Sequence, residues 1–528
     1  MRFAGRSASK VCLSQPEFKP TFTPGKPGTL MPGLLRAVLA CSVACLVICQ
    51  EARAQGTPLV PLSAAKAISP APADPAIAGA LKQVSPERIE ATIARLVAFN
   101  NRSTLSSMDT DLPPGTGINA AADWIAGQFA EISAACGSCL EVKRDEFVEP
   151  AGTTPGSRIR QPTKLTNVYA VLKGTDPAQA GRRVLVTGHY DSRNTDTMNS
   201  HDPAPGANDD ASGVAVSLEC ARVLSKLKFP STIVFVAVAG EEQGLNGSQH
   251  LARLAKAEGW DLEAVLNNDI VGGDTTPGDT GQDKSVVRVF SEGVPATATP
   301  AQVRQLHTLG SESDAPSREL ARTIVEVSKT YFAAPGHPAH VQEPFHPVMI
   351  LRADRYLRGG DHTSFNGEGF PAVRFTEWQE NFIHQHNNVR VENGIQYGDL
   401  LQYVDFKYVA NVARLNAAVL ADLAAAPGIP QNVRVLTQAL DNNTELTWEA
   451  PAGAGADIHY EVVWRPTEDS TWTEFVSAGA ATRFKIALSK DNVVFGVRSV
   501  DTAGHKSVAV LPIPLGRQAP APAAKSGF

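Results

Sequence analysis

The stretch TIVFVAVAGEEQG, residues 232–244, joins a run of β-branched and other apolar residues to two consecutive glutamates and a glycine turn. A run that is apolar throughout is typical of a strand buried on both faces of a sheet. Glu241 and Glu242 then follow the carboxyl end of that strand. Two adjacent carboxylates repel one another unless they are solvated or hold a cation, so the pair indicates either a metal ligand beside a general base or a solvated charged loop.

The sequence on both sides of this stretch alternates between strand and helix patterns. Short apolar runs at 166–171, 184–187 and 264–270 alternate with helical periodicity at 212–227 and 247–257. Strands of this kind, separated by helices, indicate a mainly parallel sheet that is covered on both faces. We therefore predict an α/β fold, a three-layer sandwich with a mainly parallel central sheet.

The amino-terminal segment has the composition of a secretory signal. Residues 34–49 (LLRAVLACSVACLVIC) are apolar apart from one arginine, follow basic residues, and precede a small-x-small site that ends at Ala54. We predict a signal peptide over 1–54, with Met1 or Met31 as the start, and export to the periplasm or the cell exterior. The alternative is a retained membrane anchor, which would be the only membrane association.

The remaining domain boundaries follow from shifts in composition. Residues 55–83 are rich in Ala, Pro and Ser and read as a linker. Ser85 then caps a helix that begins the α/β domain, residues 84–426, and a second helix is expected over 120–134. Residues 517–528 form a flexible tail.

Short alternating strands replace the helical pattern after residue 427. They are expected at 432–436, 444–448, 459–465, 472–476, 482–486 and 493–500. Several short strands separated by turn residues predict an antiparallel, immunoglobulin-like β-sandwich over 427–516, with Trp448 and Tyr460 in its core. This segment resembles a fibronectin type III domain, whose role would be either binding or that of an inert spacer.

Three cysteines remain after removal of a signal peptide. Cys136 and Cys139 are more plausibly a structural disulfide than a redox motif, because an oxidising compartment favours disulfides. Cys220 lies in an apolar helical pattern and is expected to be buried. The formal net charge of −6 gives no basic footprint, so nucleic-acid binding is not expected.

Further acidic and imidazole side chains follow the other predicted strands. An open α/β sheet places its ligand crevice at the carboxyl ends of its strands. His189 ends one strand, with Asp191 two residues on, where it suits a carboxylate that orients a metal-bound imidazole. Asp209 and Asp210 stand in a glycine-flanked turn before a helix, which also fits a helix-capping device. Asp269 closes another strand.

Asp361 and His362 follow a pair of glycines and offer a second imidazole. Together these clusters supply histidines and carboxylates, a mixture of nitrogen and oxygen ligands that suits zinc. A pair of zinc ions bridged by a carboxylate, about 3.5–4 Å apart, is the expected arrangement.

These motifs, in this order, resemble those of the co-catalytic zinc peptidases of family M28 over residues 165–390. The resemblance implies that Asp209 bridges two zinc ions, that His189 and Asp269 complete one site, and that Glu242 and His362 complete the other. It implies that Glu241 is the general base and that Asp191 orients His189. The implied activity is an exported aminopeptidase that acts on peptides or proteins.

Two further residues are expected near the substrate. His384 lies in a His-x-His pair where related enzymes carry a histidine close to the site, and Arg355 lies in an insert-like stretch, residues 274–360, expected to form the pocket wall. The alternatives to an aminopeptidase are a carboxypeptidase, a glutaminyl cyclase, or a non-catalytic binding protein. Cyclases of this kind resemble a one-zinc variant, whereas this sequence keeps the ligands for two zinc ions. Non-catalytic relatives usually lose metal ligands, and none is replaced here. The oligomeric state cannot be read from the sequence.

Overall fold

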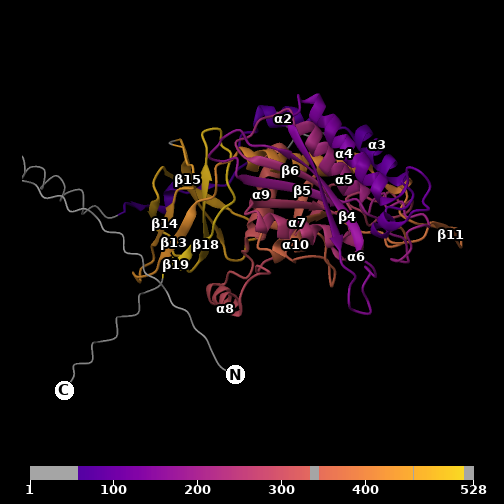
Figure 1. Ribbon diagram of the computed structural model, residues 1–528. Helices are drawn as coiled ribbons and strands as arrows, with labels where there is room; N and C mark the ends of the chain where they lie inside the picture. The colour runs from indigo at the N-terminus through magenta and orange to yellow at the C-terminus, as the bar shows by residue number, and fades with distance from the viewer. Residues whose placement is uncertain (1–56, 333–343, 456, 516–528) are drawn as a thin grey trace, which may run out of the picture. The chain divides into compact units, whose positions relative to one another are not determined.

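A sheet of eight strands, in the order β3-β4-β6-β5-β7-β10-β8-β9, lies at the centre of the α/β part of the chain (Figure 1). The computed structural model describes residues 57–332, 344–455 and 457–515. The predicted signal peptide and the predicted tail lie outside the described residues. The strands are β3 (Leu140–Glu149), β4 (Thr163–Leu172), β5 (Arg182–His189), β6 (Thr232–Val238), β7 (Asp261–Asn268), β8 (Val286–Ser291), β9 (His346–Ile350) and β10 (Ala372–Thr376).

The four central strands, β6, β5, β7 and β10, run parallel to one another. β3 and β4 are antiparallel neighbours on one side, and β8 is antiparallel to β10 on the other. The prediction of a mainly parallel sheet is confirmed for the centre, where the strands are apolar and largely buried. Antiparallel pairing at the margins was not expected.

Helices cover both faces of this sheet. Figure 1 shows α2, α3 and α4 on its upper side in the view and α10 on its lower side. One core joins α2 (Pro75–Leu81), α3 (Pro86–Val97), α4 (Gly117–Ala135), α5 (Ala211–Leu224), α9 (Pro316–Tyr331) and α11 (Phe406–Ala425). A second core joins α7 (Asn246–Ala257) and α10 (His362–Gly367). The predicted three-layer arrangement is therefore present.

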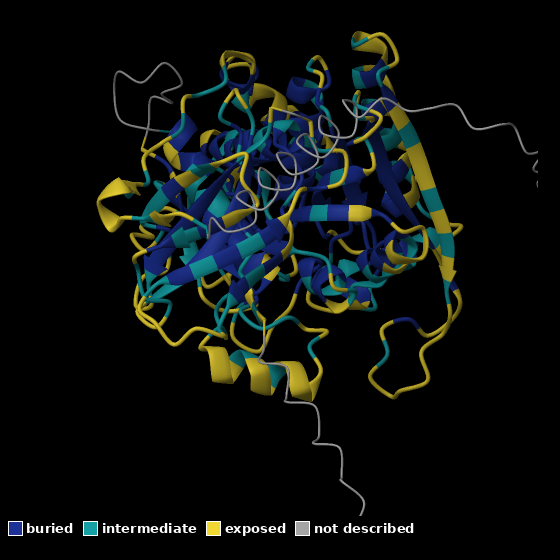
Figure 2. Ribbon diagram, turned by 90° about the vertical axis from the view of Figure 1, so that its left-hand side faces the viewer, coloured by how far each residue is buried: buried dark blue, intermediate teal, exposed yellow. Residues whose placement is uncertain are grey.

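α5 is buried on almost every side because it lies between the sheet and the helices α3 and α11. A helix that is apolar all round is expected in this setting. Cys220, on α5, is buried as expected. Figure 2 shows the difference in burial across the fold, with the central strands in dark blue (buried) and the surface helices and loops partly yellow (exposed).

The carboxy-terminal part contains two further sheets, in the orders β1-β17-β14-β13-β19 and β18-β15-β16-β2. Trp448 and Tyr460 are buried and meet edge to face, 5.5 Å between ring centroids, as expected for core aromatics. The strands are β13 (Gln431–Leu436), β14 (Thr444–Glu449), β15 (His459–Pro466), β16 (Glu474–Gly479), β17 (Arg483–Ile486), β18 (Val493–Val500) and β19 (Ile513–Leu515).

The expected linker at 55–83 is wrong for its described part. β1 (Leu59–Val60) pairs with β17, and β2 (Lys66–Ala67) pairs with β16, so each extends one sheet of the carboxy-terminal part. α2 follows, and its residues Ile77 and Leu81 are buried in the α/β core. Ala- and Pro-rich composition hid these elements because two-residue strands and a two-turn helix carry little periodicity.

The remaining elements are short or lie at the surface. α8 has no buried residue along its length. These elements are η1 (Leu62–Ala64), η2 (Thr104–Met108), α6 (Glu241–Gly244), α8 (Pro300–Leu309), β11 (Arg390–Glu392), β12 (Ile395–Tyr397) and η3 (Leu401–Tyr403). Cys136 and Cys139, between α4 and β3, form a disulfide.

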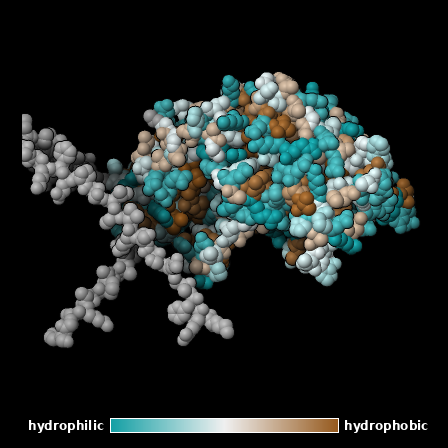
Figure 3. All heavy atoms as spheres, viewed as in Figure 1, coloured by the Kyte–Doolittle hydropathy of each residue, from teal (hydrophilic) through white to brown (hydrophobic). Residues whose placement is uncertain are grey.

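One face of the molecule shows how apolar residues are distributed on the surface. Figure 3 shows a mainly hydrophilic face on which hydrophobic residues form small separate groups. None of the helices in the described part of the chain has the length and apolar character that a membrane span requires.

The core position of α2 predicts a stability difference between two leucines of the former linker. Leu81 is 3% exposed and Leu62 is 43% exposed. Leu81→Ala should lower the free energy of unfolding by about 2–5 kcal/mol because it leaves a cavity in the core. Leu62→Ala should change it by no more than about 0.5 kcal/mol. Denaturant unfolding followed by tryptophan fluorescence measures both, and equal small effects would show that α2 is not part of the core.

Candidate metal and active site

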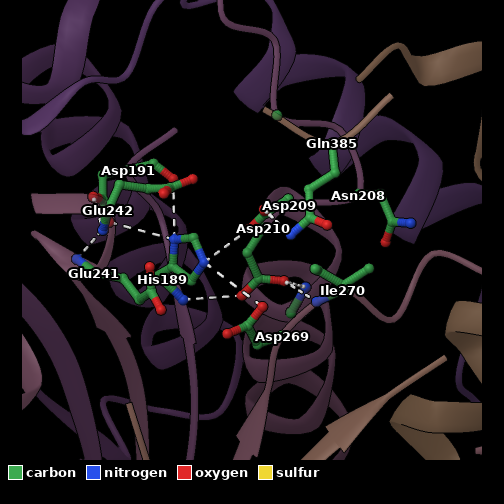
Figure 4. A network of polar contacts seen from close by, with 12 residues as sticks. His189, Asp191, Asn208, Asp209, Asp210, Glu241, Glu242, Asp269, Ile270 and Gln385 are labelled. Atoms are coloured by element: carbon green, nitrogen blue, oxygen red, sulfur yellow. Dashed lines mark hydrogen bonds and ion pairs between the residues drawn. The ribbon is translucent and has the colours of Figure 1, made fainter. Parts of the chain in front are cut away.

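Polar side chains gather where the parallel strands β5, β6 and β7 end. His189 is the last residue of β5, Glu241 and Glu242 begin α6 shortly after β6, and Asp269 follows β7. Figure 4 shows these side chains pointing toward one another. Parallel strands bring their carboxyl ends to one edge of the sheet, so residues far apart in the sequence meet there.

Gly240 allows the chain to turn from β6 into α6. Its φ of 76° is in the left-handed region, and a Cβ there would lie 2.6 Å from Leu165. A side chain at this position would therefore disfavour both the backbone conformation and the packing. The turn places Glu241 and Glu242 over the edge of the sheet.

The capping expectation for the Asp209-Asp210 pair is confirmed for Asp210. Asp210 is the N-cap of α5, and its carboxylate accepts the amides of Gly213 at 2.9 Å, His189 at 3.0 Å and Ile270 at 3.3 Å. It therefore ties α5 to the ends of β5 and β7. Asp209 instead points its carboxylate toward the histidines of the site.

Asp209 lies between two imidazoles. Its Oδ1 is 3.1 Å from Nε2 of His189, and its Oδ2 is 2.9 Å from Nε2 of His386. Each carboxylate oxygen thus faces a different histidine. A carboxylate that bridges two metal ions presents its oxygens in the same way.

Two groups of side chains converge at the site. Within each group the ligand atoms lie within 4.8 Å of one another. One group is His189, Glu241 and Asp269, and the other is Asp209, Glu242 and His386. All are buried except Glu241 and His386, which are partly exposed.

The donor atoms fit metal ions. Nε2 of His189 and Oε1 of Glu242 are buried and make no hydrogen bond within the described residues, although Asp209 and His386 lie close to them. Buried polar atoms without a partner are costly, and a cation bound between them would remove that cost. The mixture of imidazole nitrogen and carboxylate oxygen suits zinc.

The structure corrects the expectation for His362. Its ring is buried at the start of α10, with Nε2 2.8 Å from the carbonyl of Ala353 and 3.6 Å from the carboxylate of Asp354. It belongs to neither group. His386 takes the expected place, with Nε2 3.0 Å from Oε1 of Glu242.

His384 and His386 point to different places although they form one His-x-His pair. His384 stacks on Tyr403 and contacts Thr276 at 2.7 Å and the carbonyl of Gly398 at 3.1 Å. It therefore helps to shape the loop, while His386 reaches the metal ligands. The sequence offered the pair as the only signal, and nothing in the spacing shows which ring faces the site.

Asp191 contacts both His189 and the start of α6. Its Oδ1 lies 3.4 Å from Nδ1 of His189, and its backbone carbonyl lies 3.1 Å from the same atom. Its carboxylate also accepts the amides of Glu241 at 3.2 Å and Glu242 at 3.1 Å. Asp191 thus fixes the ring of His189 and the backbone of both glutamates, which agrees with its predicted positioning role.

Residues that the sequence did not reveal hold the loop that carries Asp209. Asp399 accepts the amides of Asp209 at 2.7 Å and Asn208 at 2.9 Å. The buried Arg102 donates to the carbonyls of Pro205 at 2.6 Å, Gly206 at 2.9 Å and Tyr190 at 2.7 Å. Only the folded chain brings these positions together, so no local motif marks them.

Burial and neighbouring charges shift the pKa values of several groups at the site. Burial raises the pKa of the Glu241 carboxyl well above its ordinary value, and the charges of Asp269 and Glu242 raise it further. Burial lowers the pKa of His189, but the carboxylates of Asp191 and Asp209 beside the ring outweigh it and raise that pKa well above 6.5. Burial and the charge of Asp209 raise the pKa of Asp399 to about 7.

A cavity of about 540 Å³ opens over these groups. Arg355 lines it, as the sequence predicted for the wall formed by residues 274–360. His362 and His384 do not line it. Its lining residues are Arg158, Arg193, Asp209, Glu241, Glu242, Leu245, Asp269, Arg355, Arg358, Gly359, Phe382, Gln385 and His386.

Among solved structures, the chain is similar to the LapA aminopeptidase of Legionella pneumophila at 20% identity, with a TM-score of 0.44. The match covers 66% of this chain and 74% of that one.

Curated relatives are far closer in sequence. A protein of Pyrenophora teres f. teres described as a probable zinc metalloprotease is 44% identical over 84% of this chain and 88% of its own. A protein of Pyricularia oryzae with the same description is 45% identical over 84% and 85%. The family model for peptidase family M28 matches residues 167–399, from β4 to Asp399. The chain belongs to peptidase family M28.

Proposed function

We propose that this chain is an exported zinc-dependent exopeptidase that removes amino-terminal residues from peptides, using two zinc ions. One observation carries the proposal: Asp209 directs one carboxylate oxygen to each of two histidines that belong to separate ligand groups. A site for one metal would not need a carboxylate placed between two imidazoles.

The proposed ligands follow from the two groups. His189 and Asp269 would hold one zinc ion, Glu242 and His386 the other, and Asp209 both. When bound, the zinc ions supply Lewis acidity, which polarises a peptide carbonyl and makes water more acidic. The descriptions of the curated relatives as probable zinc metalloproteases support this metal.

Glu241 is the proposed general base. Its carboxylate lines the cavity within 4.8 Å of the ligand atoms of His189 and Asp269, and Asp191 fixes its backbone. It would accept a proton from the attacking water and return it to the leaving amine. Asp191 holds His189 in place and takes no part in bond making.

The size of the cavity supports action at a chain end. A volume of about 540 Å³ is that of a small-molecule pocket and admits one or two residues. The stretch between β5 and His386 supplies complete sets of ligands for two metals, which favours peptide hydrolysis over a one-zinc cyclase.

The proposal also covers where the protein matures and what its carboxy-terminal sheets do. The disulfide between Cys136 and Cys139 supports maturation in an oxidising compartment, periplasmic or extracellular. We further propose that the two carboxy-terminal sheets form a fibronectin type III-like accessory that binds substrate or a surface. Peptides or proteins would be the partners, with no nucleic acid.

Glu241→Gln should lower kcat on aminoacyl 4-nitroanilides by about 10²- to 10⁴-fold, because the amide cannot accept the proton. Zinc content, measured by inductively coupled plasma mass spectrometry, should stay at the wild-type level, since the substitution keeps the size of the side chain. Wild-type activity in this variant would exclude Glu241 as the base.

His386→Ala should lower the zinc content of the folded protein by about one ion, because the second group loses its only imidazole. His362→Gln is the matched control, and it should keep both ions because His362 faces Ala353 and Asp354. Circular dichroism identifies variants that remain folded. The opposite result, zinc lost in His362→Gln and kept in His386→Ala, would show that His362 is the zinc ligand, as the sequence implied.

Chelation should abolish activity and lower the thermal unfolding midpoint, and zinc should restore both. Ligands that bind only the folded state stabilise it, by about 2.7 kcal/mol when free ligand is 100-fold above Kd. Differential scanning fluorimetry with and without a chelator measures the shift. An unchanged midpoint with full activity would contradict a metal-dependent site.

A further inference from the structure

Four arginines line the cavity, and they come from three separate loops. Arg158 lies between β3 and β4, Arg193 follows β5, and Arg355 and Arg358 follow β9. The carboxylates in the cavity are Asp209, Glu241, Glu242 and Asp269, the proposed metal ligands and base. If these carboxylates bind zinc, they no longer neutralise the arginines of the cavity, and the guanidinium groups are available to bind a substrate group.

Two of the arginines already have carboxylate partners. Glu380 accepts from Arg355 at 2.9 Å and from Arg358 at 2.7 Å, and Asp354 accepts from Arg355 at 3.0 Å. Carboxylates thus already bind both guanidinium groups, although Glu380 also accepts from Arg288 at 3.3 Å. These residues form the wall of the cavity and are poor candidates for holding an anion.

Arg158 and Arg193 have no carboxylate partner as close as these. Within the described residues, no carboxylate lies within 4.0 Å of Arg158, whose Nη1 donates to the backbone carbonyl of Glu242 at 2.6 Å. Arg193 donates to the carbonyls of Asn194 and Thr195, and its nearest carboxylate, that of Glu242, is 4.0 Å away. Backbone carbonyls thus hold both guanidinium groups without neutralising them.

Arg158 donates to the backbone carbonyl of Glu242 and Arg193 lies 4.0 Å from its carboxylate, so both charges lie beside this proposed metal ligand. A guanidinium group forms strong paired hydrogen bonds with carboxylates. With zinc bound, the cavity as a whole is positive, which favours an anionic substrate group.

We propose that Arg158 and Arg193 form a subsite for a substrate carboxylate beside the scissile bond. The proposal rests on the proposed peptidase function and names its substrate class. The carboxylate belongs either to an amino-terminal Glu or Asp side chain or to the free carboxyl terminus of a short peptide. These two sources share one chemistry, and different substrates separate them.

The first measurement compares matched pairs of substrates with the wild-type protein. Glu-Leu-amide against Gln-Leu-amide tests the side chain, and Leu-Leu against Leu-Leu-amide tests the terminus. In at least one pair the carboxylate substrate should have a kcat/KM about 10- to 100-fold higher, as a charge-assisted hydrogen bond would give. Arg158→Ala and Arg193→Ala should each reduce that ratio toward one.

Arg160→Ala is the matched control for the loop. Arg160 is exposed, lies two residues from Arg158 and does not line the cavity, so its removal should leave the ratio unchanged. Arg158→Lys keeps the charge and should retain part of the preference. A ratio near one in both pairs with the wild type, or a preference that survives both alanine variants, would overturn the subsite.

A binding measurement separates failure of the subsite from failure of the peptidase proposal. Calorimetric titration of the zinc-loaded Glu241→Gln protein with the same four peptides gives Kd without turnover. Tighter binding of a carboxylate peptide, weakened about tenfold or more by adding Arg158→Ala, supports the subsite even if the wild type hydrolyses none of them. Equal affinities for acid and amide refute the subsite, whatever the activity.

Discussion

Four carboxylates meet at one buried edge of the sheet, and their mutual repulsion is the constraint on which the site depends. Asp209, Glu241, Glu242 and Asp269 all face one cavity. Buried like charges are stable only when protons or cations compensate them. Burial raises the pKa of Glu241, and the neighbouring charges of Asp269 and Glu242 raise it further. The convergence of two imidazoles on the same carboxylates makes metal ions the better response.

Such a site requires a rigid frame, because its ligands would otherwise move apart. Asp210, Asp191 and Asp399 each accept backbone amides from neighbouring strands and turns, and Arg102 holds carbonyls of the loop before Asp209. These side chains fix the backbone that carries the ligands. Their hydrogen bonds are buried, so losing one partner would leave the other unsatisfied at a cost of about 1–3 kcal/mol.

The sequence located the site residues at strand ends and Asp209 before α5, but it failed on the loop after β10. His189, Glu242 and Asp269 could be located because apolar strands mark where a chain leaves the sheet. His386 lies on a long loop after β10, whose course depends on contacts with distant segments. The motif order therefore assigned the ligand to His362, and His384 was placed near the substrate. Similarly, β1 and β2 are strands only because a sheet edge is there to pair with them.

The most direct test of the two-metal site is an anomalous difference map, at the zinc absorption edge, from crystals of the zinc-loaded mature protein. Two peaks should flank the Asp209 carboxylate, one beside His189 and Asp269 and the other beside Glu242 and His386. A single peak, or a peak beside His362, would contradict the site described above.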